Sequence, residues 1–315
     1  MDFQLKHITH QSSEADKQEV TKFQSGDYAE MTASRLNRPW GNEIYGMMGA
    51  FAGDRCIGTT SYTVSPHRLG ILSQVLTDEV FRKRGVGRSV VGQAVETFRH
   101  HRARAVYLAS GQPFVRAFYQ SFGFEFAGAM GRRHAFKLTL DPSGSEEVLF
   151  RPDQRTTLRG MQDDDQASLS ALFNADHSAV VKHYELGCYL GSHFEGEFYT
   201  LRKQTEASGY RVTVLEGEET VLGMGTVIAS VRRQESHRGV LDVLVHPNYQ
   251  EHTAGIVDQL ISETSLTCLV AYAGVNETER GAILEQAGFS PVGTFHRHLE
   301  IGSDLYDLVA YQRNE

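Results

Sequence analysis

Cysteine is scarce in this chain, and long hydrophobic runs are missing. Cys56, Cys188 and Cys268 are the only cysteines, and they are widely spaced. This spacing excludes a disulfide framework, offers no CxxC pair for zinc and favours a reducing compartment, so we expect a cytoplasmic protein with no metal. The longest apolar runs fall far short of the roughly 20 residues that a membrane helix needs. The opening residues lack the apolar segment of a signal peptide, so we expect no export signal.

Basic and acidic residues are distributed unevenly between the two halves. The 315 residues carry a net charge of −8. Residues 1–140 contain 18 Lys and Arg against 12 Asp and Glu, whereas residues 141–315 contain 13 against 27. A basic first half can attract an anionic ligand, and an acidic second half argues against nucleic-acid binding by the whole chain. Chance drift of surface charge is the alternative.

The length and the local patterns suggest two domains joined by an exposed linker. Turn formers and charges in 141–147 mark the linker, so we predict domains at 1–140 and 151–315 with a linker at 141–150. In the first domain we expect strands at 3–8, 43–51, 56–64, 70–77, 105–109 and 125–140, with helices at 14–24, 86–100 and 113–122. In the second we expect strands at 156–159, 211–216, 222–231, 240–245, 267–272 and 292–312, with helices at 163–174, 253–263 and 279–286. These orders predict a mixed α/β sheet in each half.

The two halves also repeat each other in sequence. Residues 81–87 align with 249–255, and residues 116–124 align with 280–289 if one residue is inserted. The Gly-Phe ends of the second pair match directly. An internal duplication is the economical explanation.

A glycine-containing basic segment is predicted to connect a strand to a helix. It reads Arg82-Lys83-Arg84-Gly85-Val86-Gly87-Arg88-Ser89. The glycines allow a tight turn, and the helix that follows presents unpaired N–H groups and its positive dipole end, so an anion such as a pyrophosphate fits there. A Rossmann fingerprint is excluded because position 90 is Val90, and no P-loop is present. The alternative is an exposed basic turn that caps the helix.

Two motifs together resemble the GNAT acetyltransferase superfamily. The Arg-x-x-Gly-x-Gly pattern ending at Gly87 is followed by Phe118-Tyr119-x-x-x-Gly123-Phe124 in the order and spacing of that family. The resemblance covers 1–140 well and 150–315 more weakly. It implies two tandem GNAT-like domains, each with a mostly antiparallel central sheet flanked by helices.

The resemblance also implies roles for particular residues. The loop would bind the pyrophosphate of acetyl-CoA, with these positions in or beside it: Arg82, Lys83, Arg84, Gly85, Val86, Gly87, Arg88 and Ser89. A main-chain N–H of Val75, Leu76 or Thr77 would hold the thioester carbonyl where the preceding strand splays from its neighbour. Gln112 stands where an Asn often contacts the pantetheine arm.

The second motif implies a proton donor. Tyr119 would lie near the sulfur, beside Phe118 at the cofactor site, and protonate the departing thiolate. The alternative for Tyr119 is aromatic packing alone.

The base that removes the proton of the amine is left open. Asp78 and Glu79 end a strand and are candidates, although Asp78 also suits an ordinary turn, and His134 is a weaker candidate. The polar segment 25–42 lies where GNAT domains shape the acceptor site. Arg35, Arg38 and Trp40 are therefore candidates to face the acceptor, with an exposed connecting loop as the expected structure.

The second copy departs from the motifs. Thr253 stands at the first glycine, the basic cluster has become Gln250-Glu251-His252, and Leu284 replaces Tyr119. We therefore predict a second domain without cofactor chemistry.

Taken together, the sequence predicts an acetyl-CoA-dependent N-acetyltransferase that acts directly on a primary amine of a small molecule. A non-catalytic CoA-binding or scaffolding protein is the alternative, and a longer acyl chain or a hydroxyl acceptor is not excluded. We expect no nucleic-acid or membrane partner and a monomer or homodimer. The acidic second half favours a cationic amine.

Overall fold

The computed structural model describes residues 2–112, 115–130, 133–177, 179–189, 194–206 and 210–314. The chain separates into two compact units. The first comprises Met1–Phe126, Phe136–Ser145 and Asp163–Ala167, and the second comprises Ala127–Ala135, Glu146–Gln162 and Ser168–Glu315. The structure contains two seven-stranded sheets, and most of each sheet belongs to one unit.

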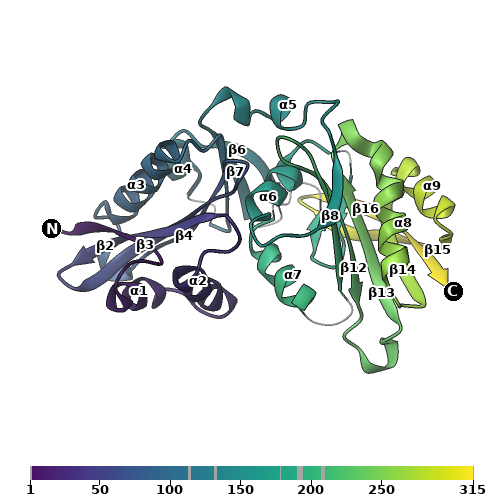
Figure 1. The fold of residues 1–315 in the computed structure, drawn as a ribbon, viewed down its shortest axis with the longest axis horizontal. Helices are drawn as coiled ribbons and strands as arrows, with labels where there is room; N and C mark the ends of the chain where they lie inside the picture. Colours follow the sequence, from purple (N-terminus) through teal and green to yellow (C-terminus); the bar gives the residue numbers. More distant parts are fainter. Residues whose placement is uncertain are drawn as a thin grey trace. The chain divides into compact units, whose positions relative to one another are not determined.

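The first sheet has the strand order β1-β2-β3-β4-β5-β7-β6. Its strands are β1 (Gln4–Ile8), β2 (Ile44–Ala52), β3 (Arg55–Val64), β4 (Leu69–Thr77), β5 (Ala105–Ser110), β6 (Glu125–Met130) and β7 (Arg133–Thr139). The helices are α1 (Glu14–Thr21), α2 (Asp27–Asn37), α3 (Val86–His100) and α4 (Arg116–Gln120). Figure 1 shows α1 and α2 on one face of this sheet and α3 and α4 on the other. The strands predicted from the sequence are confirmed within a few residues.

Helix α3 has the bounds that its apolar spacing predicts. Its buried positions recur every three or four residues along one side, at Val86, Val90, Val91, Ala94, Val95 and Phe98. This side packs on β2, β3 and β4 around Tyr62 and Phe98. Complete burial of a side chain of the size of valine or phenylalanine stabilises a fold by roughly 1.5–3 kcal/mol, so α3 is fixed firmly to the sheet.

The prediction of an exposed connecting loop at 25–42 is wrong, because much of this segment forms α2. Arg35 and Trp40 are 2% and 4% exposed, so neither lies in an exposed loop. The Arg35 guanidinium lies 3.0 Å from a carboxylate oxygen of Glu43 and stacks 4.1 Å from the Trp40 ring. The polar pattern concealed the helix because its buried side carries a paired arginine and Thr32 beside apolar residues.

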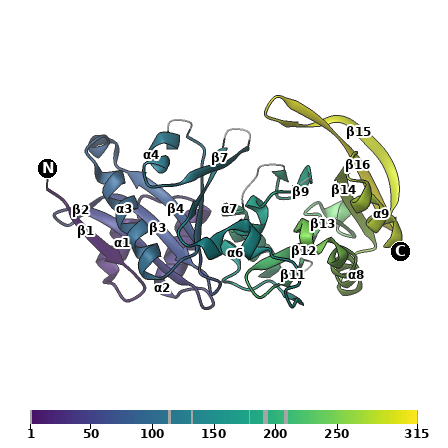
Figure 2. The ribbon, with the colours of Figure 1, turned by 90° about the horizontal axis from the view of Figure 1, so that it is seen from above.

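The second sheet has the order β15-β16-β14-β13-β12-β11-β8. Its strands are β8 (Thr157–Gly160), β11 (Arg211–Glu216), β12 (Val221–Ala229), β13 (Arg238–Val245), β14 (Cys268–Gly274), β15 (Ser290–Ile301) and β16 (Asp304–Asn314). The helices are α5 (Glu146–Leu149), α6 (Gln166–Asn174), α7 (Gly196–Glu206), α8 (Thr253–Glu263) and α9 (Thr278–Gln286). Figure 2 shows β15 and β16 as a long curved hairpin. A short hairpin of β9 (Val181–His183) and β10 (Cys188–Tyr189) and helix α7 were not predicted.

The two sheets have the same strand order when β1-β2-β3-β4-β5-β7-β6 is set against β8-β11-β12-β13-β14-β16-β15. In each, the parallel pairing recorded is between corresponding strands, β4 with β5 and β13 with β14. The remaining recorded pairings are antiparallel. This correspondence confirms the repeated architecture that the sequence predicts.

Candidate functional site

The candidate site lies where β4 diverges from β5. The two strands pair from Leu69 opposite Ala105 to Ile71 opposite Tyr107 and have no recorded pairing beyond that point. β4 continues to Thr77 and β5 to Ser110. The diverging ends leave main-chain groups of β4 without a β5 partner.

An irregularity in β4 lies directly at this divergence. Thr59 of β3 pairs with Leu76, but Ser61 pairs with Ser73, so β4 carries one extra residue there. Gln74 has a φ of 55°, which is unusual for a residue other than glycine. A β-bulge of this kind turns a strand and re-aims the groups that follow it.

The direction of the N–H groups after the bulge follows from the ladder. The Asp78 N–H donates to the Ile57 carbonyl at 3.0 Å, so it points toward β3. N–H groups alternate in direction along a regular strand, so the Leu76 N–H also points toward β3 and that of Thr77 points away from it. Of the three predicted candidates, Thr77 therefore has a main-chain donor directed to the side of the gap, while Val75 directly follows the bulge.

The loop after β4 ends in a helix start with free backbone donors. Gly85 has a φ of 84° and precedes α3, and no side chain caps this end. The Ser89 N–H donates to the Gly85 carbonyl at 3.0 Å, which is the first hydrogen bond of the helix. The N–H groups before it have no acceptor within the helix. A Cβ placed on Gly85 would have no atom within 4 Å, so space alone would admit a side chain. Glycine is favoured here because the backbone is left-handed, a conformation that other residues rarely adopt.

Cationic side chains surround this helix start. Those that are exposed there are Arg82, Lys83, Arg84 and Arg88. Arg82 lies 3.1 Å from a carboxylate oxygen of Glu79, while Arg84 and Arg88 lie over the rings of Phe81 and Phe122. Exposed pairs of this kind contribute little energy, so the cations can turn toward an anion.

The second predicted motif lies beside the first. A Cβ placed on Gly87 would lie 3.5 Å from the Thr77 hydroxyl oxygen and 3.9 Å from the Phe118 ring. Strand β4, the start of α3 and helix α4 therefore meet at Gly87. The fold brings together the predicted residues of both motifs.

Tyr119 is enclosed by other aromatic rings. It is 5% exposed, and its ring centroid lies 5.1, 5.9 and 5.4 Å from those of Phe118, Phe124 and Phe136. This packing fixes the ring on the side of the sheet that carries α3 and α4.

The other predicted site residues have contacts of their own away from the helix start at Gly85. Gln112 is exposed in the loop after β5, where its N–H donates to the Ser110 hydroxyl at 3.3 Å. The predicted helix start at 113–114 lies outside the described residues. Asp78 accepts a hydrogen bond from the Val80 N–H and pairs with Arg55 at 2.5 Å, so it stabilises the turn. His134 lies on β7.

The corresponding loop of the second unit has a different geometry. A 3-10 helix at Pro247–His252 runs directly into α8, and Thr253 has a φ of −59° where the first unit has a left-handed glycine. The Gln250 side chain donates to the Val245 carbonyl at 2.9 Å and accepts from the Thr253 hydroxyl at 3.2 Å. Leu284 is buried at the position matched to Tyr119.

The gap between β13 and β14 is also filled. These strands diverge after Val240 and Val270, but β12 and β13 pair without a bulge. β9 contacts both diverging strands. The Arg280 guanidinium donates to the carbonyls of Val181 on β9 and Val243 on β13. In the second unit, β9 and the Arg280 side chain therefore fill the gap between the diverging strands.

Residues 13–124 match the model of a protein family described as "Acetyltransferase (GNAT) family". The matched residues include the whole of β4, α3 and α4. Residues 13–124 form a GNAT acetyltransferase domain. Among curated proteins, none matches the chain. The second unit is GNAT-like in its strand order.

Solved structures similar to this chain include other acetyltransferases. Ribosomal-protein-alanine N-acetyltransferase from Brucella melitensis is 19% identical, with a TM-score of 0.41 over 50% of this chain and 99% of that one. The yncA protein of Salmonella typhimurium, solved with its cofactor acetyl-CoA, is 17% identical, with a TM-score of 0.45 over 51% of this chain and 94% of that one. A spermidine N-acetyltransferase chimera from Vibrio cholerae and hSSAT is 14% identical, with a TM-score of 0.39 over 50% and 95%.

Two further properties concern metals and membranes. Among the described residues, no group of three or more His, Cys, Asp or Glu side chains is arranged to hold a metal ion. No helix in the described part of the chain is long and apolar enough to cross a membrane.

Proposed function

We propose that the GNAT domain transfers an acetyl group directly from acetyl-CoA to a primary amine of a small molecule. The observation that carries this proposal is the divergence of β4 from β5 immediately before an uncapped, cation-rich helix start. A helix N-terminus with free N–H groups binds phosphate well. The loop from Arg82 to Ser89 would hold the pyrophosphate through these groups, with its cations screening the charge.

The thioester carbonyl would be polarised by β4. The Thr77 N–H points away from β3, so it would donate to an oxyanion that forms in the gap, and Val75, beside the bulge, is the second candidate donor. Removal of one such donor in other enzymes reduces kcat by about 10²–10³-fold. The bulge at Gln74 supports this role because it re-aims the donors that follow it.

Tyr119 would supply the proton that the reaction requires. Acetyl-CoA provides its acetyl group as a thioester. The amine nitrogen bonds to the carbonyl carbon, the carbon–sulfur bond breaks, and the Tyr119 hydroxyl protonates the sulfur. The amine loses its proton to water, which reprotonates Tyr119, because Asp78 is engaged in its turn.

We propose that the second unit neither binds acetyl-CoA nor catalyses transfer. Its loop lacks the left-handed glycine, Arg280 links β9 to β13 where the strands diverge, and Leu284 has no proton to donate. We also propose a cytoplasmic location, which is supported by three buried cysteines that form no disulfide.

Calorimetric titration with acetyl-CoA, combined with thiol release over a panel of amines, tests the proposal. We expect one site per chain and turnover with at least one amine. Gly87→Glu should abolish binding, because α3 holds Gly87 in a helical backbone and only ordinary contacts surround a Cβ there, so the added charge is the main change. Gly255→Glu is the matched control in α8 and should leave binding unchanged.

Three outcomes would contradict parts of the proposal. Two sites per chain would disprove the assignment of binding to the first unit alone. Tight binding without thiol release from any amine would favour a CoA-binding protein without catalysis. Loss of binding in Gly255→Glu but not in Gly87→Glu would place the site in the second unit.

A further inference from the structure

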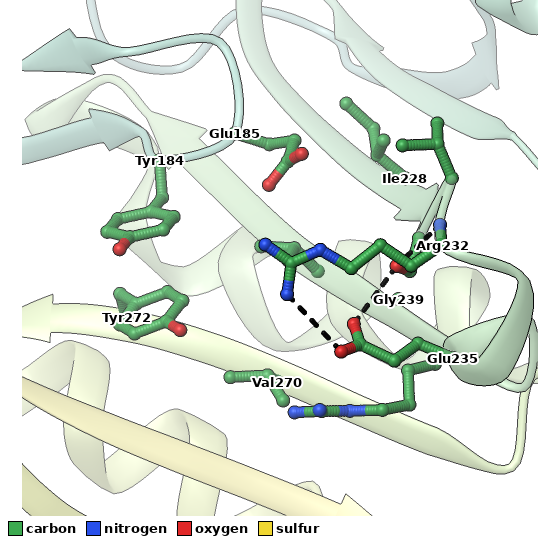
Figure 3. Close-up of a pocket in the computed structure, with 12 residues that line it drawn as sticks. Tyr184, Glu185, Ile228, Arg232, Glu235, Gly239, Val270 and Tyr272 are labelled. Carbon is green, nitrogen blue, oxygen red and sulfur yellow. Dashed lines mark hydrogen bonds and ion pairs between the residues drawn. The ribbon is translucent and has the colours of Figure 1, made fainter.

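A cavity lies in the second unit, on the strands that correspond to β3, β4 and β5. Its volume is about 390 Å³, within the range of small-molecule sites. Ile228 of β12, Val240 of β13 and Val270 of β14 contribute an apolar surface. Figure 3 shows the Tyr184 and Tyr272 rings side by side at one end of the cavity. Their centroids are 3.7 Å apart and their planes are nearly parallel.

A buried carboxylate holds one wall of this cavity in place. Asp242 is 3% exposed, and it accepts hydrogen bonds from the N–H groups of Tyr184 at 2.8 Å and Glu185 at 3.2 Å. His183, also buried, lies 3.1 Å from the same carboxylate. The hydrogen bonds to Asp242 therefore hold the backbone that carries the Tyr184 ring and the Glu185 carboxylate in place. A wall built in this way suits a binding site, because little of it must be ordered when a ligand arrives.

The Arg238 charge is not needed by the fold of the sheet. Arg238 opens the parallel pairing of β13 with β14, as Leu69 opens that of β4 with β5. Leu69 is fully buried, so the same architecture is built with an apolar residue at this position. An arginine that lines a cavity where the duplicate has a core leucine needs another explanation.

Two of the four charged side chains are available to a ligand. Arg232 and Glu235 pair at 3.3 Å, and Figure 3 shows Glu185 on the other side of the Arg232 guanidinium from Glu235. In the part of the chain that the structure describes, neither Glu185 nor Arg238 has a side-chain hydrogen bond or ion pair. Burial and the nearby Asp242 raise the pKa of Glu185 in spite of the opposing charges of His183 and Arg232, so a further cation beside this carboxylate would be favourable.

We propose that this cavity binds a zwitterion with an apolar side chain, either a free amino acid or a short peptide. Glu185 accepts the ammonium group, Arg238 binds the carboxylate, and Ile228, Val240 and Val270 contact the side chain. Two carboxylates and two guanidinium groups give the lining no net charge, which matches a ligand of no net charge. The site is independent of acetyl transfer in the first unit, and its test uses no acetyl-CoA.

Calorimetry on the full chain with three matched probes tests this proposal. L-leucine carries both charges, L-leucinamide only the ammonium and 4-methylpentanoate only the carboxylate. We expect L-leucine to bind at millimolar concentration or below, and each single-charge probe to bind at least about tenfold more weakly. Leucyl-leucine is the fourth probe, and tighter binding of this dipeptide would assign the site to peptides.

Variants locate the binding. Glu185→Gln and Arg238→Gln should each lower the affinity for L-leucine or leucyl-leucine at least about tenfold. Glu251→Gln and Arg155→Gln remove exposed charges of the same unit outside the cavity and should have no effect. Thermal melting confirms that each variant is folded.

Three results would overturn the zwitterion site. These are no binding of either double-charged probe, L-leucinamide binding as tightly as L-leucine, and binding that survives both Glu185→Gln and Arg238→Gln. None of them bears on the first unit, whose own test is the acetyl-CoA titration.

Discussion

Gly58 of β3 provides a direct test of how the sheet positions the proposed pyrophosphate site. A Cβ placed on Gly58 would lie 2.5 Å from Cγ1 of Val86, the first residue of α3, and 3.1 Å from the Leu76 carbonyl oxygen of β4. Carbon atoms in contact are about 3.5–4.0 Å apart, so Gly58→Ala requires the start of α3 to move by about 1 Å. Overpacking of this size costs about 1–3 kcal/mol of unfolding free energy.

The same displacement should impair function beyond the loss of stability. It moves the helix N–H groups relative to β4, and misplacement by about 1 Å can reduce turnover by about 100-fold. Urea unfolding gives the stability, and acetyl-CoA titration with steady-state kinetics gives the effect on the site. In a double-mutant cycle, Val86→Ala should relieve part of the clash, so the double variant should be more stable than the sum of the two single changes predicts. A Gly58→Ala protein with wild-type stability and acetyl-CoA affinity would refute this reasoning.

Three further outcomes are expected. Tyr119→Phe should lower kcat by about 10²–10⁴-fold with little change in KM, and an unchanged kcat would remove the proposed acid. Arg35→Met should cost about 3–5 kcal/mol in chemical denaturation because it leaves Glu43 buried without its partner, and adding Glu43→Gln should restore most of the loss. Burial lowers the pKa of Lys182 to about 8 from an ordinary value of 10.5, so the unfolded chain binds more protons between these values and stability should rise with pH through that window. In Lys182→Met this rise should disappear, and stability at pH 7 should increase by up to about 3 kcal/mol; an unchanged pH profile would contradict the burial of this amine.

Much of the fold followed from periodicity and turn chemistry. Helices α3 and α8 have the predicted bounds because their apolar residues recur on one side and tertiary packing agrees with local preference. The predicted strand pairs flanking Gly53 and Gly217 are hairpins in the structure. The loop before α3 was also found from its glycines and cations, which are local features.

The features that the sequence did not predict are those that depend on residues distant in the chain. Helix α2 buries Arg35 against Glu43 and Trp40, and no local pattern marks an arginine as buried. The bulge at Gln74 depends on the registers of β3 and β4 together. The filling of the second gap depends on Arg280 reaching β9, about 100 residues earlier in the chain. The unpredicted arrangement of Glu185 and Arg238 is likewise assembled from separate segments.

The bridge made by Arg280 has an evolutionary consequence. Its side chain and that of its partner Glu277 are only 12% and 10% exposed, and Glu277 also accepts from the Val180 N–H at 2.6 Å. Deleting the arginine alone would remove a hydrogen-bond donor from a buried carboxylate and from two carbonyl oxygens, at a cost of several kcal/mol. If the second unit lost its cofactor chemistry as proposed, single substitutions that reopen the gap pass through destabilised proteins, which makes its divergence difficult to undo.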